Sequence, residues 1–305
     1  MQPSRRQALR ILAGLAALAA MSRAAAVTPG GLIERAIPSS GEKLPLIGVG
    51  TWQTFDVGGD AAARASLREV LSLFAQAGGR VIDSSPMYGS SETVTGDLLA
   101  EAGLAGKRFV ATKVWTNGRD EGIRQMEQSF ARLRVARMDL MQVHNLVDAA
   151  TQTKTLEDWK AKDRVRYIGI THYTSSAYAE VERWVKTGRY QFLQINYSLA
   201  ERSSEDRLLP LARDKNVAVV INRPFAEGAL FRRVRGKPVP DWAAEFGAAT
   251  WAQFFLKWIV SHPAVTCAIP GTGKPEHMAD NLAAGKGALP DAAMRLRMAR
   301  HLDSL

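Results

Sequence analysis

Eight short apolar runs recur along the chain, and stretches with helical periodicity follow them. The runs are Leu46 to Val49, Arg80 to Ser84, Phe109 to Val114, Met138 to His144, Arg166 to Thr171, Phe192 to Tyr197, Val217 to Asn222 and Val265 to Ile269. Examples of the helical stretches are Ala61 to Ala77, Gly122 to Leu133, Ser175 to Thr187 and Ala248 to Val260. This alternation predicts a parallel sheet, because each helix returns the chain to the start of the next strand.

Eight such units without a linker predict a closed (β/α)8 barrel, the TIM barrel, as a single domain over residues 27–305. The alternative is an open doubly wound sheet, which favours a G-x-G-x-x-G turn after the first strand. The stretch Gly48-Val49-Gly50-Thr51-Trp52-Gln53 lacks the third glycine. A β-hairpin from Leu32 through Leu44 is predicted before the barrel, and a short C-terminal helix, Pro290 to His301, after it.

The first 26 residues have the charged, apolar and cleavable order that is typical of a signal peptide. Arg5 and Arg6 resemble the twin-arginine consensus, although Ala8 stands where a phenylalanine is usual. Cleavage near Ala26 would leave a mature protein without a membrane anchor. We therefore expect the twin-arginine translocase to export the folded protein to the periplasm.

One cysteine, Cys267, excludes an intramolecular disulfide, as expected for a protein that folds before export. Its apolar surroundings predict a buried and inert thiol. The chain has 40 Lys and Arg against 30 Asp and Glu, and four of those arginines lie in the signal segment. The remaining basic residues are scattered singly, so we expect no nucleic-acid partner.

Four groups able to take part in proton transfer lie at or just after three consecutive predicted strand ends: Asp83, Tyr88, Lys113 and His144. In a barrel of this kind the active site lies at those ends. A phenol beside an ammonium can protonate a carbonyl oxygen, and Lys113 is expected to lower the pKa of Tyr88 by favouring the phenolate. No side chain can supply hydride, so a nicotinamide is required.

The motifs Val81-Ile82-Asp83 through Tyr88-Gly89, Thr112-Lys113-Val114-Trp115 and Asp139 to Asn145 resemble those of the aldo-keto reductase family. The resemblance extends from Leu46 to Asn281. It implies an NADPH-dependent oxidoreductase that converts small aldehydes or ketones to alcohols. The catalytic tetrad would be Asp83, Tyr88, Lys113 and His144, with Tyr88 as the acid in reduction and the base in oxidation.

The resemblance also implies that NADP(H) binds at several strand ends. The residues are Thr51, Asp83, Thr171, His172, Gln194, Asn222, Arg223, Pro224, Phe225, Gly228, Leu230, Ile269, Gly271, Thr272, Gly273, Lys274, His277, Asp280 and Asn281. Thr171, His172 and Gln194 match the positions that hold the nicotinamide carboxamide, with His172 in place of an asparagine. Asn222 stands in the stretch where an aromatic side chain often stacks on the nicotinamide, and it cannot stack.

The eighth strand leads into the stretch that, by the same resemblance, binds the adenosine 2′-phosphate. Thr272, Lys274 and His277 would meet the phosphate, with His277 where an arginine is common, and a helix beginning near Pro275 would aim its amides at it. Asp280 and Asn281 match the adenine contacts.

Trp52, Tyr88, Trp115 and His144 are expected to line the substrate site, with an open mouth because the tail is short. Two other functions stay open. A metal-dependent hydrolase could use His144, His172 and Asp83, but its usual His-x-His is absent from the first strand, so no metal is expected. The second alternative function is a nucleotide-binding sensor or partner subunit in which turnover is incidental.

Overall fold

The structure is a computed structural model that describes residues 31–305, of which Leu32–Leu305 form one compact unit. Within that range it contains an eight-stranded sheet whose neighbouring strands are parallel. The strands are β3 (Val49–Gly50), β4 (Val81–Asp83), β5 (Phe109–Val114), β6 (Met138–His144), β7 (Val165–Thr171), β8 (Phe192–Asn196), β9 (Ala218–Asn222) and β10 (Val265–Ala268).

Hydrogen bonds between the first and last strand regions close this sheet into a barrel. The Gly48 amide donates to the carbonyl of Ala268 at 2.8 Å, and the Ala268 amide donates to the carbonyl of Leu46 at 2.8 Å. Parallel bridges also pair Ile47 with Ala268 and Gly50 with Gly271. The predicted (β/α)8 barrel is therefore confirmed, and the open sheet is not the fold.

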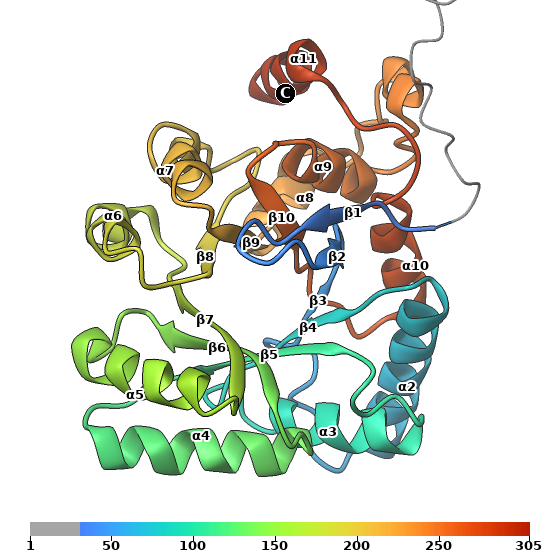
Figure 1. The fold of residues 1–305 in the computed structure, drawn as a ribbon. Coiled ribbons are helices and arrows are strands. Elements are labelled where there is room, and N and C mark those ends of the chain that lie inside the picture. The colour runs from blue at the N-terminus through green and yellow to red at the C-terminus, as the bar shows by residue number, and fades with distance from the viewer. Residues whose placement is uncertain (1–30) are drawn as a thin grey trace, which may run out of the picture. The chain divides into compact units, whose positions relative to one another are not determined.

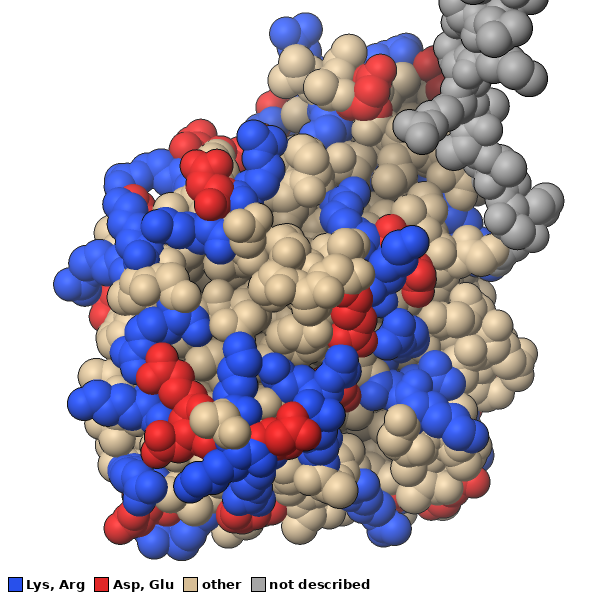
Figure 2. All heavy atoms as spheres, in the orientation of Figure 1, with Lys and Arg blue, Asp and Glu red and all other residues tan. Residues whose placement is uncertain are grey.

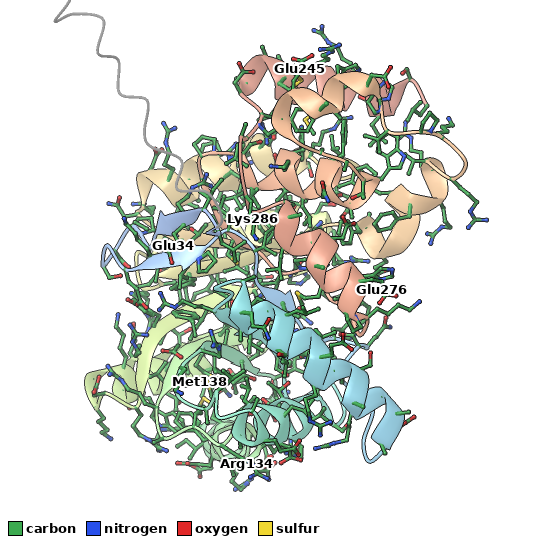
Figure 3. The ribbon with its side chains drawn as sticks, turned by 90° about the vertical axis from the view of Figure 1, so that its right-hand side faces the viewer. Glu34, Arg134, Met138, Glu245, Glu276 and Lys286 are labelled. Atoms are coloured by element: carbon green, nitrogen blue, oxygen red, sulfur yellow. The ribbon has the colours of Figure 1, made fainter. Side chains whose placement is uncertain are left out.

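Helices pack around the outside of the strands (Figure 1). They are α2 (Ala61–Gln76), α3 (Ser91–Glu101), α4 (Arg119–Leu133), α5 (Ala149–Ala161), α6 (Tyr178–Lys186), α7 (Leu208–Asp214), α8 (Ala229–Arg233), α9 (Trp251–Val260), α10 (Pro275–Ala283) and α11 (Ala292–Asp303). Helices α2 and α10 lie side by side, so the chain following the last strand packs against the helix that follows the first (Figure 3). No helix of residues 31–305 has the length and apolar character needed to cross a membrane.

The predicted hairpin, β1 (Glu34–Ala36) paired antiparallel with β2 (Lys43–Pro45), is confirmed. Leu44 of β2 and Ile37, which follows β1, are fully buried in one cluster with side chains of the barrel strands, such as Phe109 and Phe192. Figure 1 shows the hairpin in front of the strands. Burying these side chains against the barrel interior closes the end of the barrel at which the strands begin.

Polar contacts also tie the hairpin turn to the barrel wall. Glu42 bonds to Arg80 at 3.0 Å and to Arg166 at 2.5 Å, and the Tyr167 hydroxyl donates to Glu42 at 2.9 Å. Figure 2 shows basic and acidic side chains interspersed over this face. The hairpin end of the barrel is thus held by apolar packing inside and by paired charges outside.

Helix starts differ from the predicted ones where a polar side chain caps the helix. Thr250 accepts a hydrogen bond from the Gln253 amide, so α9 begins at Trp251 and not at Ala248. Asp291 accepts from the Met294 amide, so the last helix begins at Ala292 and not at Pro290. A cap fixes a helix end more locally than the apolar period does.

Two further predicted elements are shorter in the structure. The first barrel strand is limited to Val49–Gly50, because the preceding residues form only bridges to Ala268. The predicted helix from Ser175 begins with a 3-10 turn, and α6 proper starts at Tyr178.

Cys267 is fully buried, and burial raises the pKa of its thiol, which confirms an inert cysteine. The expected export signal lies outside the described residues.

Candidate active site

A cavity of about 510 Å³ lies at the ends of the barrel strands that are remote from the hairpin. Its lining includes residues at or just beyond the ends of six strands, Thr51, Asp83, His144, Thr171, Asn222 and Ile269, together with Gln194 from the middle of β8. Trp52, Tyr88 and Trp115, from the loops that follow β3, β4 and β5, also line it. The structure therefore brings the predicted substrate residues together with a large part of the predicted cofactor residues.

A buried ion pair joins Asp83, on the wall of this cavity, to Lys113, which does not line it. The Lys113 Nζ is 2.6 Å from the Asp83 Oδ2 and 2.6 Å from the carbonyl oxygen of Ser84, and the lysine side chain is fully buried. Burial alone lowers the pKa of Lys113, but the charge and hydrogen bonds of Asp83 and Tyr88 together raise it. Lys113 is therefore a charged ammonium at neutral pH.

Tyr88 lies between this ion pair and His144. Its ring centroid is 5.0 Å from the Lys113 Nζ and 5.9 Å from the centroid of the His144 ring, which it meets edge to face. Burial raises the pKa of the phenol, and the Asp83 charge offsets part of the opposing effect of Lys113. Lys113 does lower this pKa, as predicted, but burial outweighs its effect, so the predicted net decrease is wrong and the pKa of Tyr88 is raised. Tyr88 carries its proton at neutral pH.

His144 is a neutral imidazole. Burial lowers its pKa to about 2, and the positive charge of Lys113 acts in the same direction. Its Nδ1 lies 3.0 Å from the hydroxyl of Ser85, and its ring lies 6.4 Å from that of Trp115, between centroids. A neutral ring has one N–H and one lone pair, so His144 can donate one hydrogen bond and accept another.

Two buried residues of this site were not predicted, Gln142 and Ser85. The Gln142 amide donates to the Asp83 Oδ1 at 3.2 Å. Because side chains alternate along a strand, Gln142 faces the barrel interior two residues before His144, and that spacing was the available signal. Ser85 follows Asp83 by two residues, and no sequence pattern indicates its hydrogen bond to His144.

Of the three residues predicted to hold the nicotinamide carboxamide, two line the cavity and one does not. Gln194 donates to the Asp83 Oδ1 at 2.8 Å and accepts from the Thr171 hydroxyl at 3.1 Å, and both residues line the cavity. The His172 side chain is not part of the lining. Its Nδ1 accepts from the amides of Tyr173 and Thr174, at 3.0 and 3.3 Å, so its ring stabilises the loop after β7.

Much of the loop after β9 lines the cavity, with Asn222, Arg223, Pro224, Phe225 and Gly228, whereas Leu230 is buried in the core. Arg223 is held by an ion pair with Glu227 at 2.7 Å and by a hydrogen bond to the Tyr173 carbonyl at 2.8 Å. This guanidinium is therefore already partnered on the cavity wall.

The predicted phosphate and adenine residues form a separate group outside the cavity, apart from Gly271, which lines it. Thr272 is buried and accepts from the Lys274 amide, while Lys274 and His277 are exposed at the start of α10. Gly273 accepts a hydrogen bond from Ser66 of α2 through its carbonyl. The first turn of α10, near Glu276 in Figure 3, thus presents amides and a lysine at the surface beside α2.

The two residues predicted to contact adenine are held differently from one another. The Asp280 carboxylate accepts from the Thr250 hydroxyl at 2.9 Å and from the Gln253 amide at 2.7 Å, which ties α10 to the start of α9. Asn281 is almost fully buried. No group of three His, Cys, Asp or Glu that could hold a metal occurs within residues 31–305.

Comparison with known proteins identifies the family of this chain. The model of the Aldo/keto reductase family matches residues 46–297. Methylglyoxal reductase YeaE of Escherichia coli K12 is 30% identical over 274 residues, which cover 86% of this chain and 93% of that protein. The NADH-specific methylglyoxal reductase of the same organism is 22% identical over 308 residues, covering 82% and 92%.

An aldo/keto reductase from Klebsiella pneumoniae, solved in complex with NADP and acetate, has a TM-score of 0.73 and 25% identity to this chain. The alignment covers 86% of this chain and 93% of that one. The fold and the site together define a nucleotide-dependent oxidoreductase built on a (β/α)8 barrel. The chain belongs to the aldo/keto reductase family.

The low pKa of His144 predicts a pH dependence of stability. Below about pH 6.5 the unfolded chain binds a proton at this histidine and the folded protein does not, so stability falls as the pH drops from there towards 2. A His144→Gln variant lacks this loss. Between pH 7 and pH 5, urea unfolding should show the parent losing about 2 kcal/mol more than the variant, at about 1.4 kcal/mol per pH unit. Equal losses would contradict a buried neutral imidazole.

Proposed function

We propose that this protein reduces aldehydes or ketones to alcohols with a reduced nicotinamide nucleotide, and that Tyr88 is the general acid. The observation that carries the proposal is one cavity lined by a protonated phenol and a neutral imidazole, with a buried ammonium and carboxylate pair behind them. Proton donation to a carbonyl oxygen needs a donor that keeps its proton at neutral pH and a means to stabilise the anion that remains.

The cavity has orphan polar atoms that fit the nicotinamide end of such a cofactor. The side-chain oxygens of Asn145 and Asn222 are buried and have no hydrogen-bond partner among residues 31–305, and both residues line the cavity. An unpartnered buried acceptor costs about 1 to 3 kcal/mol, which a ligand amide group can recover. Asn222 stands where an aromatic side chain would otherwise stack on the nicotinamide. Its side-chain oxygen would instead accept a hydrogen bond from the nicotinamide carboxamide, next to Gln194.

When bound, the reduced nicotinamide supplies the hydride. Tyr88 gives its proton to the carbonyl oxygen, and the Lys113 ammonium, held by Asp83, stabilises the phenolate that forms. His144, the other polar ring on this wall, hydrogen-bonds to the same oxygen and orients the carbonyl. Gln142 and Gln194 hold the Asp83 carboxylate by its other oxygen, so the ion pair keeps its geometry during the proton transfer.

The mouth of the cavity favours carbonyl compounds with an apolar substituent. Five of the six large exposed apolar side chains in the described chain line this cavity: Trp52, Met87, Trp115, Tyr173 and Phe231. Arg223 is the one lysine or arginine of the described lining, and it is already paired with Glu227. The two relatives named for methylglyoxal act on a small carbonyl compound. An aromatic aldehyde would use more of this apolar surface.

Replacing Tyr88 by phenylalanine tests the proposed acid. The ring stays and only the proton donor is lost, so we expect reduction of an aldehyde to fall by about a hundred- to ten-thousand-fold while the dissociation constant of the cofactor stays the same. Tyr190→Phe is the matched control, because that buried hydroxyl bonds to Thr153 and lies outside the cavity lining. If the Tyr88 variant keeps more than about a tenth of the parent rate, Tyr88 is not the acid.

We propose that NADPH is preferred over NADH. The 2′-phosphate would meet the Lys274 ammonium, the Thr272 hydroxyl and the amides that open α10. One charge-assisted hydrogen bond contributes about 1.5 to 3 kcal/mol, which is enough for a tenfold ratio. The relatives differ in this respect, since one is NADH-specific and the Klebsiella pneumoniae structure holds NADP.

Dissociation constants measured by tryptophan fluorescence test this preference. We expect NADPH to bind at least about tenfold more tightly, and Lys274→Met to weaken NADPH but not NADH. The same change at Lys286, near the other end of α10, is the control (Figure 3). Equal affinities for the two nucleotides would refute the preference.

We also propose that the protein is exported to the periplasm by the twin-arginine translocase and cleaved near Ala26. The order of Arg5, Arg6 and the apolar run that follows is what supports this proposal. Changing both arginines to lysine should leave an active precursor in the cytoplasm. Immunoblots of periplasmic and cytoplasmic fractions measure this, and unchanged periplasmic recovery would refute the assignment.

A further inference from the structure

Ser85 is a buried hydroxyl that the tetrad does not include. It lies two residues after Asp83 and is fully inaccessible to solvent. Its Oγ is 3.0 Å from the Nδ1 of His144, and the amide of Met87 donates to the same oxygen at 3.4 Å. No other side-chain contact of this hydroxyl occurs within residues 31–305. Ser85 therefore connects the loop that carries Tyr88 to the ring of His144.

The direction of the Ser85–His144 hydrogen bond follows from where the protons can go. The Ser85 oxygen already accepts from the Met87 amide, and the hydroxyl has a single proton to donate. The Nδ1 of His144 lies within hydrogen-bond distance of the Ser85 hydroxyl and can accept this proton. If Nδ1 were itself protonated, the hydroxyl proton would have no acceptor in a buried site, and burying an unpaired donor is unfavourable. The satisfied arrangement has Ser85 donating to an unprotonated Nδ1.

His144 then has one proton left to place. Its pKa of about 2, caused mainly by burial, keeps the ring neutral, so the proton absent from Nδ1 must be on Nε2. The ring lines the cavity, and no residue between 31 and 305 hydrogen-bonds to Nε2. The ring packs against Tyr88 and Trp115, and Lys113 and His172 are the charged or titratable groups that act on it; none of these groups is a negatively charged acceptor for Nε2.

We propose that Ser85 is a positioning residue that fixes His144 in the tautomer with its proton on Nε2, so that His144 donates a hydrogen bond to the carbonyl oxygen of the substrate. This role rests on the proposed reductase function for its substrate. The carbonyl oxygen then receives two donors, the Tyr88 hydroxyl and the His144 Nε2–H. With the other tautomer, Nε2 would present a lone pair to that oxygen and repel it.

The tautomer can be measured without any substrate. In nitrogen NMR spectra of protein labelled in histidine, protonated and unprotonated ring nitrogens are well separated. The chain has five histidines, and a His144→Gln variant identifies the signals of His144. We expect Nδ1 of the parent to be unprotonated and Nε2 to be protonated at pH 7. A protonated Nδ1 in the parent overturns the proposal.

Ser85→Ala should change these signals towards a mixture of the two tautomers, because Nδ1 loses its donor. Ser84→Ala is the matched control: that neighbouring hydroxyl is also buried, but it accepts from Thr51 and makes no hydrogen bond to His144 among the described residues. We expect the His144 signals of the control to match the parent. Signals that stay unchanged in Ser85→Ala, or that change as much in Ser84→Ala, would also overturn the proposal.

Kinetics connect the tautomer to turnover. Ser85→Ala should lower kcat/KM for an aldehyde by about three- to tenfold, the range expected for one hydrogen bond, without changing the dissociation constant of NADPH. Ser85→Thr, which keeps the hydroxyl, should recover most of the loss. A general structural defect would instead weaken NADPH binding and would not be rescued.

The two proposals can fail separately. The expected tautomer in a protein that reduces no carbonyl compound would refute the proposed function and leave Ser85 as the residue that orients His144. Carbonyl reduction by a protein whose His144 is protonated at Nδ1 would support the proposed function and refute the role of Ser85. An unchanged kcat/KM in Ser85→Ala would refute the catalytic part of the role.

Discussion

A single buried charge organises the whole site. Lys113 is fully inaccessible to solvent, and an unpaired ammonium there would be strongly destabilising, so the carboxylate of Asp83 must lie beside it. That requirement fixes one oxygen of Asp83 on the lysine and leaves the other for the amides of Gln142 and Gln194. The ends of four strands, β4, β5, β6 and β8, are thereby held by one carboxylate.

The same burial that makes the ion pair necessary also sets the protonation of its neighbours. Removing water raises the pKa of Tyr88 and lowers that of His144, so both rings are neutral at physiological pH. A positive charge on Lys113 then faces two neutral hydrogen-bonding rings. This combination suits a site in which negative charge appears on an oxygen only during the reaction.

Local sequence patterns located the elements well where packing alone determines them. The strands Phe109–Val114 and Met138–His144 agree residue for residue with the predicted ones, since nearly all of their residues are buried on both faces of the sheet. The ends of α9 and α11 were missed because the caps Thr250 and Asp291 decide them. His172 was expected at the nicotinamide, but its ring serves the loop after β7, which sequence spacing could not reveal.

The sequence by itself determined the order of strands and helices, the barrel class and the four groups of the tetrad, because these depend on periodicity and on which residues follow the strands. Tertiary structure alone decided the direction of the Tyr88 pKa, the contact of Ser85 with His144 and the position of Gln142 behind Asp83. The first depends mainly on burial, and the other two depend on contacts between segments 59 residues apart in the chain, Ser85 with His144 and Asp83 with Gln142. No local pattern encodes the distance between two such atoms.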